Sequence, residues 1–157
     1  HGEAADSRHA ATDAQRWLPL RGWAETRAAT ALMAGHDLRP THVYTSPFVR
    51  AVQTAEIIAS ALELDCPIPS LPPLVPGGTS DQALRILDDH DAEDRVLLVS
   101  HEPTVRVLSS HLASFDFPPF PTGGVAVFSL GFGGIRRFVG RVDPRIRAFR
   151  GGDDRGH

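Results

Sequence analysis

The pattern of apolar and polar positions predicts two helices in the first half of the chain. In residues 22–34 apolar positions recur near helical spacing, with Pro19 ahead of them as a start signal and Gly35 behind them as a stop. Residues 47–62 begin with Pro47, whose fixed backbone angle suits the first turn of a helix. We therefore predict a helix over each segment.

Two more helices are predicted in the second half of the chain. Residues 81–90 carry leucines on one side, and Ser80 stands ahead of them as a candidate cap. Pro103 opens the last helix, which ends before a proline-rich loop. We expect Val107, Leu108 and Leu112 of this helix to face the core.

Short apolar runs between the helices predict strands. Residues 41–45 form one such run. Residues 95–100 contain a continuous β-branched and aliphatic stretch, which is typical of a strand buried on both faces in a parallel sheet. The proline-bounded residues 67–71 are a weaker strand candidate.

The last two apolar runs, residues 125–130 and 135–142, flank a glycine-rich turn at residues 131–134 and predict a β-hairpin. Strands that alternate with helices favour an α/β fold, a three-layer sandwich with a mostly parallel central sheet, flanking helices and one antiparallel edge. We expect one domain over residues 1–143 and a loosely ordered tail, rich in arginine and glycine, over residues 144–157.

Length and composition narrow the possible functions. With 157 residues, 41% of them hydrophobic, the chain is long enough for one well-buried core and too short for two ordinary domains. The net charge of -3 gives no reason to expect nucleic-acid binding, and no apolar run approaches the roughly 18 residues of a membrane span. The single cysteine, Cys66, cannot form an internal disulfide, which fits a reducing cytoplasm.

All 16 basic residues are arginines, which excludes chemistry that needs a lysine. The chain cannot form a lysine Schiff base, anchor pyridoxal phosphate or supply a Walker lysine. Arginine is therefore the only strong permanent cation available for phosphate, and its planar fork of donors suits paired oxygens.

Three separate segments carry candidate chemistry. Residues 1–3 are His-Gly-Glu, residues 46–54 are Ser-Pro-Phe-Val-Arg-Ala-Val-Gln-Thr, and residues 100–105 are Ser-His-Glu-Pro-Thr-Val. An imidazole can attack phosphorus or carry a proton, and a guanidinium can bind phosphate oxygens. Arg50 and His101 both follow predicted strands, at the edge of an α/β sheet where active sites form. The set suits phosphoryl transfer without a metal.

In this order and at these separations, the segments resemble the histidine phosphatase superfamily, whose members open with Arg-His-Gly and carry a second histidine late in the chain. The compact size, residues 46–54, the Leu-Pro-Pro-Leu-Val-Pro stretch at residues 71–76 and Ser-His-x-Pro-x-Val are most similar to small bacterial phosphohistidine phosphatases of the SixA type. The resemblance spans most of the chain and implies a phosphoglycerate mutase-like fold. The family places a buried strand and an arginine ahead of the nucleophilic histidine, so we expect several more apolar residues and an arginine upstream of His1.

The resemblance implies catalytic roles for three residues. His1 would be the nucleophile that takes the phosphoryl group and is then freed by water, which divides one difficult displacement into two. Arg50 would bind the non-bridging oxygens and neutralise their charge. His101 would add a further donor or shuttle a proton at the same site.

Two further residues are candidates for phosphate binding. Arg16 lies in Arg-Trp-Leu-Pro-Leu-Arg-Gly, which resembles the family pattern Arg-Pro-Leu-Thr-x-x-Gly, although Pro19 replaces the threonine. A surface role for Arg16 is the alternative, with equal weight. Thr122, beside Gly123, is a candidate to approach the bound oxyanion, with a role in the turn as its alternative.

The residues also bear on the substrate. Larger superfamily members place a general acid in the middle of the chain, whereas residues 71–78 here contain no carboxylate, which resembles the small branch. The pKa of an imidazole is about 6.5, so an imidazole can leave already protonated, whereas an alkoxide needs a donated proton. Glu3, Asp81 and Glu102 are the remaining possible donors, each more typical of a surface or capping carboxylate.

We therefore expect a metal-independent phosphatase that needs no cofactor, dephosphorylates phosphohistidine on a partner protein and releases inorganic phosphate. One alternative is a small-molecule phosphomonoesterase that acts on a sugar or nucleotide phosphate. The other is a non-catalytic phosphate-binding module. No membrane or nucleic-acid partner is expected.

Other motif-like patterns carry no comparable signal. The segment at His101 begins like the zinc-protease pattern His-Glu-x-x-His, but Val105 stands where the second histidine is needed. The acidic residues between positions 88 and 94 are usually a solvated helix end and only occasionally a cation site. The remaining histidines, His42 and His90 among them, belong to no motif. We expect no metal site.

Overall fold

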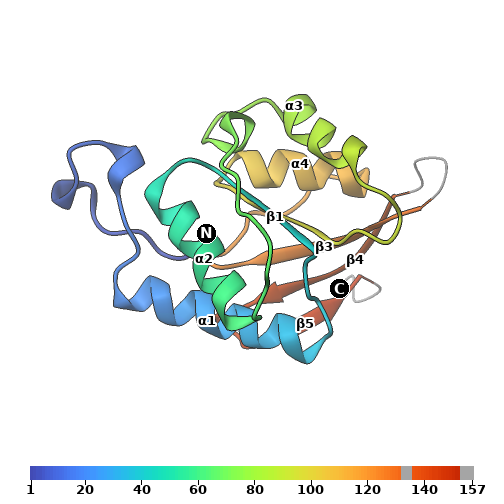
Figure 1. Cartoon of the computed structure of the whole chain (residues 1–157), viewed down its shortest axis with the longest axis horizontal. Helices are drawn as coiled ribbons and strands as arrows, with labels where there is room; N and C mark the ends of the chain where they lie inside the picture. Colours follow the sequence, from blue (N-terminus) through green and yellow to red (C-terminus); the bar gives the residue numbers. More distant parts are fainter. Residues whose placement is uncertain (132–135, 153–157) are drawn as a thin grey trace.

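Helices lie on both sides of the strands in the computed structural model, which describes residues 1–131 and 136–152. Figure 1 shows α1 (Leu20–Gly35) and α2 (Val49–Ala61) on one side of the strands, and α3 (Ser80–Arg85) and α4 (Thr104–Ala113) on the other. The described residues also contain short 3-10 turns: η1 (Ser7–His9), η2 (Asp13–Gln15), η3 (Pro72–Leu74) and η4 (Ile86–Asp89).

The described strands form two sheets. β1 (His42–Thr45) and β2 (Val96–Val99) pair in parallel. β3 (Val125–Leu130), β4 (Arg136–Asp143) and β5 (Ala148–Gly151) form an antiparallel sheet in that order. The α/β fold class is confirmed, and the antiparallel part is larger than the single edge that the sequence indicated. The candidate strand at residues 67–71 is reduced to one bridge, between Ser70 and Thr45.

β5 lies in the segment predicted to be a loosely ordered tail. Its Phe149 pairs with Val142 of β4 and packs against the apolar cluster that contains Val142. The ring of Phe149 also lies against His36, with ring centroids 4.5 Å apart. The predicted disorder is therefore wrong for residues 148–151, because pairing with β4 carries an aromatic residue into the core. Residues 132–135, which hold most of the predicted turn and the predicted start of the second hairpin strand, lie outside the described part of the chain, as do the last residues, 153–157.

Three details of the helices differ from the sequence predictions. α2 begins at Val49, so Pro47 precedes the helix instead of opening it. Ser80 is the first residue of α3 and not its cap. Val107 of α4 is exposed, because it borders an open surface hollow, while Leu108 is buried as predicted. None of the helices in the described part of the chain has the length and apolar character that a bilayer crossing requires.

A small-residue face of α2 fixes this helix on the parallel strands. Ala51 and Ala55 are fully buried against Val43 of β1 and Val99 of β2. Small side chains let the helix backbone approach the strands closely, and such packed contacts deform little. The first turn of α2 is therefore held at the carboxyl ends of β1 and β2. Figure 1 shows the amino terminus of the chain beside the same helix.

Candidate active site

The loops after β1 and β2 bring Arg50 and His101 to His1. Arg50 lies in the first turn of α2, and His101 comes two residues after the end of β2. The imidazole rings of His1 and His101 have centroids 4.7 Å apart, and Arg50 Nε lies 3.3 Å from His1 Nε2. The three side chains predicted to share a site are therefore in one place, although they come from distant parts of the sequence.

Backbone contacts set the tautomer of His1. Its Nδ1 lies 2.6 Å from the carbonyl oxygen of Gly2, which can only accept, so Nδ1 carries the proton. The other ring nitrogen, Nε2, then has a free lone pair and accepts the Arg50 Nε–H. Gly2 is held close to α1, because a Cβ there would lie 2.6 Å from Gly22 O and from Thr26 Oγ1. His1 thus presents a neutral imidazole with its unprotonated nitrogen beside a guanidinium.

His101 is a buried, neutral imidazole. It is 2% exposed, and its Nε2 lies 2.8 Å from Ser46 Oγ. Burial, together with the nearby Arg50 charge, lowers the pKa of His101 from 6.5 to about 3. Its Nδ1 is buried with no hydrogen-bond partner among the described residues. Buried polar atoms are nearly always paired, so this nitrogen marks a position suited to a polar ligand.

The Arg50 guanidinium is held by a carboxylate from the loop before α1. Arg50 is 5% exposed and donates from Nη1 to Asp13 O at 2.6 Å and from Nη2 to Asp13 Oδ2 at 3.0 Å. Arg16 Nη1 donates to the other oxygen, Asp13 Oδ1, at 2.9 Å. A hydrogen bond from Arg16, with a further contribution from Arg50, lowers the pKa of the Asp13 carboxyl, so this group is ionised at neutral pH. One carboxylate therefore bridges both arginines that the sequence named as phosphate ligands.

Comparison with known proteins shows which family has this arrangement of residues. Residues 1–74 match the family model of the histidine phosphatase superfamily (branch 1). Phosphohistidine phosphatase SixA of Escherichia coli (strain K12) is 32% identical to this chain over 147 residues, which are 92% of this chain and 90% of that protein. The chain belongs to the histidine phosphatase superfamily. It is a phosphatase of this type.

Solved structures of SixA proteins share the fold of this phosphatase over nearly its whole length. The structure of the protein histidine phosphatase SixA complexed with tungstate has a TM-score of 0.86 at 31% identity and covers 94% of this chain and 96% of that one. A candidate SixA phosphohistidine phosphatase from Agrobacterium tumefaciens has a TM-score of 0.79 at 24% identity and covers 92% of this chain and 94% of that one. The fold expected from the family resemblance is confirmed.

The two additional candidates for phosphate binding, Arg16 and Thr122, differ in how they contact the site. Arg16 reaches the site through Asp13, and its Nε donates to Ala5 O at 2.7 Å. The Thr122 hydroxyl is exposed and donates to Glu25 Oε2 at 3.1 Å. The next residue, Gly123, donates its N–H to His1 O at 2.8 Å. Thr122 therefore borders the site through the backbone, and contact of its hydroxyl with phosphate stays a prediction.

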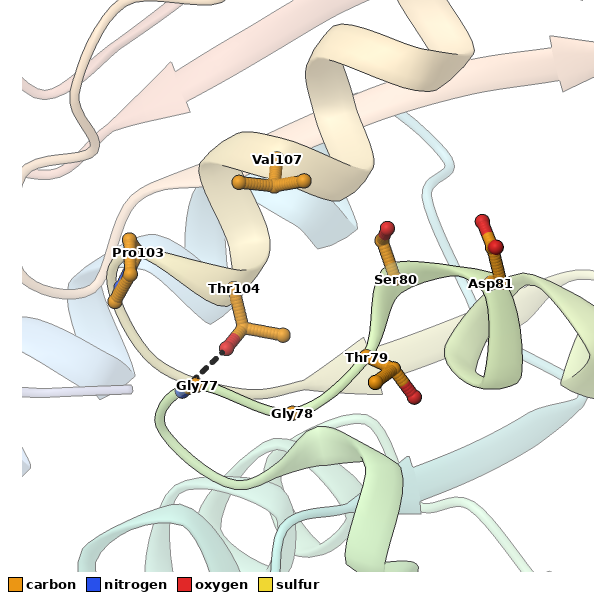
Figure 2. A pocket seen from close by; sticks show the side chains of 8 residues that line it. All are labelled: Gly77, Gly78, Thr79, Ser80, Asp81, Pro103, Thr104 and Val107. Atoms are coloured by element: carbon orange, nitrogen blue, oxygen red, sulfur yellow. Dashed lines mark hydrogen bonds between the residues drawn. The ribbon is translucent and has the colours of Figure 1, made fainter.

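Of the three carboxylates considered as proton donors, Glu3 and Glu102 are held by other groups, and Asp81 lines a surface hollow. Glu3 pairs with Arg21 at 2.9 Å, and Glu102 Oε1 accepts the Phe120 N–H at 2.8 Å. Asp81 lines a surface hollow of about 370 Å³ between residues 77–81 and the start of α4. Figure 2 shows this hollow, with the Gly77 N–H bonded to Thr104 Oγ1 at its margin.

Asp13 is the site residue that the sequence analysis missed. The spacing of Asp13 and Arg16, three residues apart on a polar segment, is a local signal for their ion pair. Nothing local indicates the second contact, with Arg50, because α2 meets η2 only in the folded chain.

Proposed function

We propose that this phosphatase removes the phosphoryl group from phosphohistidine on a partner protein, in the cytoplasm, with His1 as nucleophile and inorganic phosphate as product. The observation that carries the proposal is the convergence at His1. An unprotonated imidazole nitrogen faces Arg50, and the neutral, buried imidazole of His101 lies beside it. The similarity to SixA proteins over nearly the whole chain supports this substrate class.

The contacts indicate a role for each residue in the two steps of the reaction. His1 Nε2 attacks phosphorus while the bond between phosphorus and the substrate imidazole breaks, and the imidazole leaves with its proton. Water then attacks the phosphorylated His1, which releases inorganic phosphate and restores the free ring. Arg50 binds the non-bridging oxygens during both steps and offsets their charge. Tungstate bound to the related SixA is a tetrahedral oxyanion, of the same shape as the group transferred here.

His101 would bind the phosphoryl group through its unpaired nitrogen. Ser46 Oγ accepts the Phe48 N–H at 3.3 Å, which leaves its hydroxyl proton available for His101 Nε2. His101 Nδ1 then carries the ring proton and can donate it to a phosphoryl oxygen. A bound dianion also raises the pKa of an adjacent imidazole, so His101 can take up or release a proton as the charge on the phosphoryl group changes.

The carboxylates favour a phosphoramidate over a phosphate ester. Asp13 is the carboxylate at the Arg50 guanidinium, and its lowered pKa makes it a weak proton donor. Glu3 and Glu102 are held by other partners. A leaving imidazole needs no such donor, whereas an alkoxide does.

An exposed apolar surface next to the site favours a protein substrate. Trp17, Leu20 and Trp23 follow Arg16 in the chain and are exposed large apolar side chains. Leu20 and Trp23 lie one turn apart at the start of α1, so they share one side of that helix. Aromatic residues in exposed positions beside a site are typical of protein contact surfaces.

The test compares two substrate classes with the same enzyme. A histidine-phosphotransfer domain carrying radiolabelled phosphohistidine is one substrate, and a sugar phosphate is the other. We expect kcat/KM to be at least about 100-fold higher for the phosphohistidine domain, the size of the general-acid contribution that esters lack here. Comparable rates on both would favour the small-molecule phosphomonoesterase.

Trapping the intermediate tests the chemistry separately. Denaturation at alkaline pH, where phosphohistidine survives, should leave label on the wild-type enzyme. The His1→Asn variant should carry none, while the exposed control His9→Asn should match the wild type. Phosphate binding without labelling or turnover would favour the non-catalytic module.

A further inference from the structure

Two histidines and an aspartate meet at the opposite end of the parallel strands from the active site. His42 is the first residue of β1, His90 follows η4, and Asp94 lies shortly before β2. His42 Nδ1 is 3.5 Å from Asp94 Oδ1, and His90 Nδ1 is 3.1 Å from Asp94 Oδ2. One ligand atom from each residue lies within 4.8 Å of the others. Ser46 and His101, by contrast, follow the carboxyl ends of the same strands.

These separations fit a set of metal ligands. In a tetrahedral zinc site with bonds of about 2.0 to 2.1 Å, adjacent ligand atoms stand roughly 3.3 to 3.4 Å apart. The nitrogen-to-oxygen distances, 3.1 Å from His90 to Asp94 Oδ2 and 3.5 Å from His42 to Asp94 Oδ1, lie on either side of that range, each to its own oxygen of the carboxylate. Two imidazoles and one carboxylate also form a known zinc ligand set that leaves a fourth position for water.

A tyrosine supplies the hydrogen-bond partner that a metal-binding histidine needs at its other ring nitrogen. Tyr44 lies two residues after His42 on β1, so both side chains stand on the same face of the strand. The Tyr44 hydroxyl is 3.0 Å from His90 Nε2, and the ring of His90 lies 4.5 Å from that of His42. The His90 side chain is only 8% exposed. With Nδ1 directed to a metal, His90 Nε2–H donates to Tyr44, which fixes the tautomer and the orientation of the ring.

We propose that His42, His90 and Asp94 bind one zinc ion or a similar divalent transition ion. The ion ties the start of β1 to the segment that leads into β2, and it enters from solvent, since His42 and Asp94 are partly exposed. Imidazole ligands favour zinc, nickel or cobalt over calcium and magnesium. Metal binding at His42 Nδ1 replaces the contact of this nitrogen with Thr41 Oγ1 at 3.0 Å. The ion lies away from His1 and takes no part in the phosphoryl chemistry.

The rival arrangement is metal-free, with His90 Nδ1 donating to Asp94 Oδ2 and His42 Nδ1 hydrogen-bonded to Thr41 Oγ1. The experiment uses the full chain, freed of metal by a chelator and then titrated with Co²⁺ and with Zn²⁺. We expect the visible absorption of tetrahedral Co²⁺ to saturate at one ion per chain, and Zn²⁺ to displace it. Zn²⁺ should also raise the melting temperature of the wild type, because it binds the folded state.

Variants locate the ion. His42→Asn and Asp94→Asn should abolish both the Co²⁺ absorption and the thermal shift, while His111→Asn, an exposed histidine on α4, should leave both unchanged. Tyr44→Phe should keep the ion with affinity weakened about 10- to 100-fold. Circular dichroism without metal checks that each variant is folded.

Two outcomes overturn the proposal. The first is a wild type that binds no more Zn²⁺ than Asp94→Asn does, which leaves the metal-free arrangement. The second is loss of the ion in His101→Asn with retention in His42→Asn, which places it at the catalytic imidazoles.

Discussion

Replacing Asp13 with asparagine should tighten the binding of inorganic phosphate to this phosphatase. The carboxylate of Asp13 accepts hydrogen bonds from Arg50 at 3.0 Å and from Arg16 at 2.9 Å. A phosphate that binds these two guanidinium groups must displace it. Asparagine keeps the shape of the side chain but removes the charge, and the Asp13 carbonyl contact with Arg50 belongs to the backbone and is retained.

The size of the effect follows from the burial of the two partners. The Arg50 side chain is 6% exposed and the Asp13 side chain 54% exposed. An exposed ion pair contributes at most about 1 kcal/mol, and a charged hydrogen bond to a buried group contributes about 1.5 to 3 kcal/mol. Because Asp13 is more than half exposed, we take the low end, about 1 to 1.5 kcal/mol. This corresponds to roughly a 5- to 12-fold lower dissociation constant for phosphate.

The assay measures inorganic phosphate as a competitive inhibitor at constant ionic strength, with isothermal calorimetry as a direct check. Asp6→Asn is the matched control, since Asp6 lies in the same loop and pairs with the exposed Arg8. This control should leave the inhibition constant unchanged. An inhibition constant for Asp13→Asn that is equal to or higher than that of the wild type would refute the reasoning, because Asp13 would then position the arginines instead of competing with phosphate.

Three further outcomes follow from the site. Ser46→Ala removes the hydroxyl 2.8 Å from His101 Nε2, so kcat should fall about 10- to 100-fold with KM little changed in steady-state kinetics; full activity would contradict the proposed role of Ser46. Burial lowers the pKa of His101 from 6.5 to about 3, so the neutral ring stabilises the fold fully above pH 6.5 and this contribution is lost as the pH falls toward 3. His101→Asn should therefore flatten the decline in the free energy of unfolding between about pH 7 and pH 4.5, measured with urea, and an unchanged slope would contradict this. Gly22→Ala should lower stability by about 1 to 3 kcal/mol in thermal melts and reduce activity, because its Cβ would collide with the Glu3 carbonyl next to His1. Gly35→Ala, where a Cβ has open space, should do neither.

The sequence by itself determined most of the helices and strands and indicated which residues meet at the active site. Continuous apolar runs marked β1 and β2, and the residues that follow such strands meet at one sheet edge whatever the loop details. This rule is why Arg50 and His101 could be assigned to one place before any coordinates. The runs that became β3 and β4 were also predictable, because strand and turn signals are local.

Tertiary structure alone decided the features whose partners are far away in the chain. β5 is only four residues long, and it exists because β4 pairs with it. Asp13 reaches Arg50 because α2 packs beside η2. His42 and Asp94 become neighbours through the parallel register of β1 and β2, in which His42 lies opposite Val96. Local patterns encode helix and strand periodicity, but a side-chain cluster depends on how those elements pack, and the packing is a property of the whole fold.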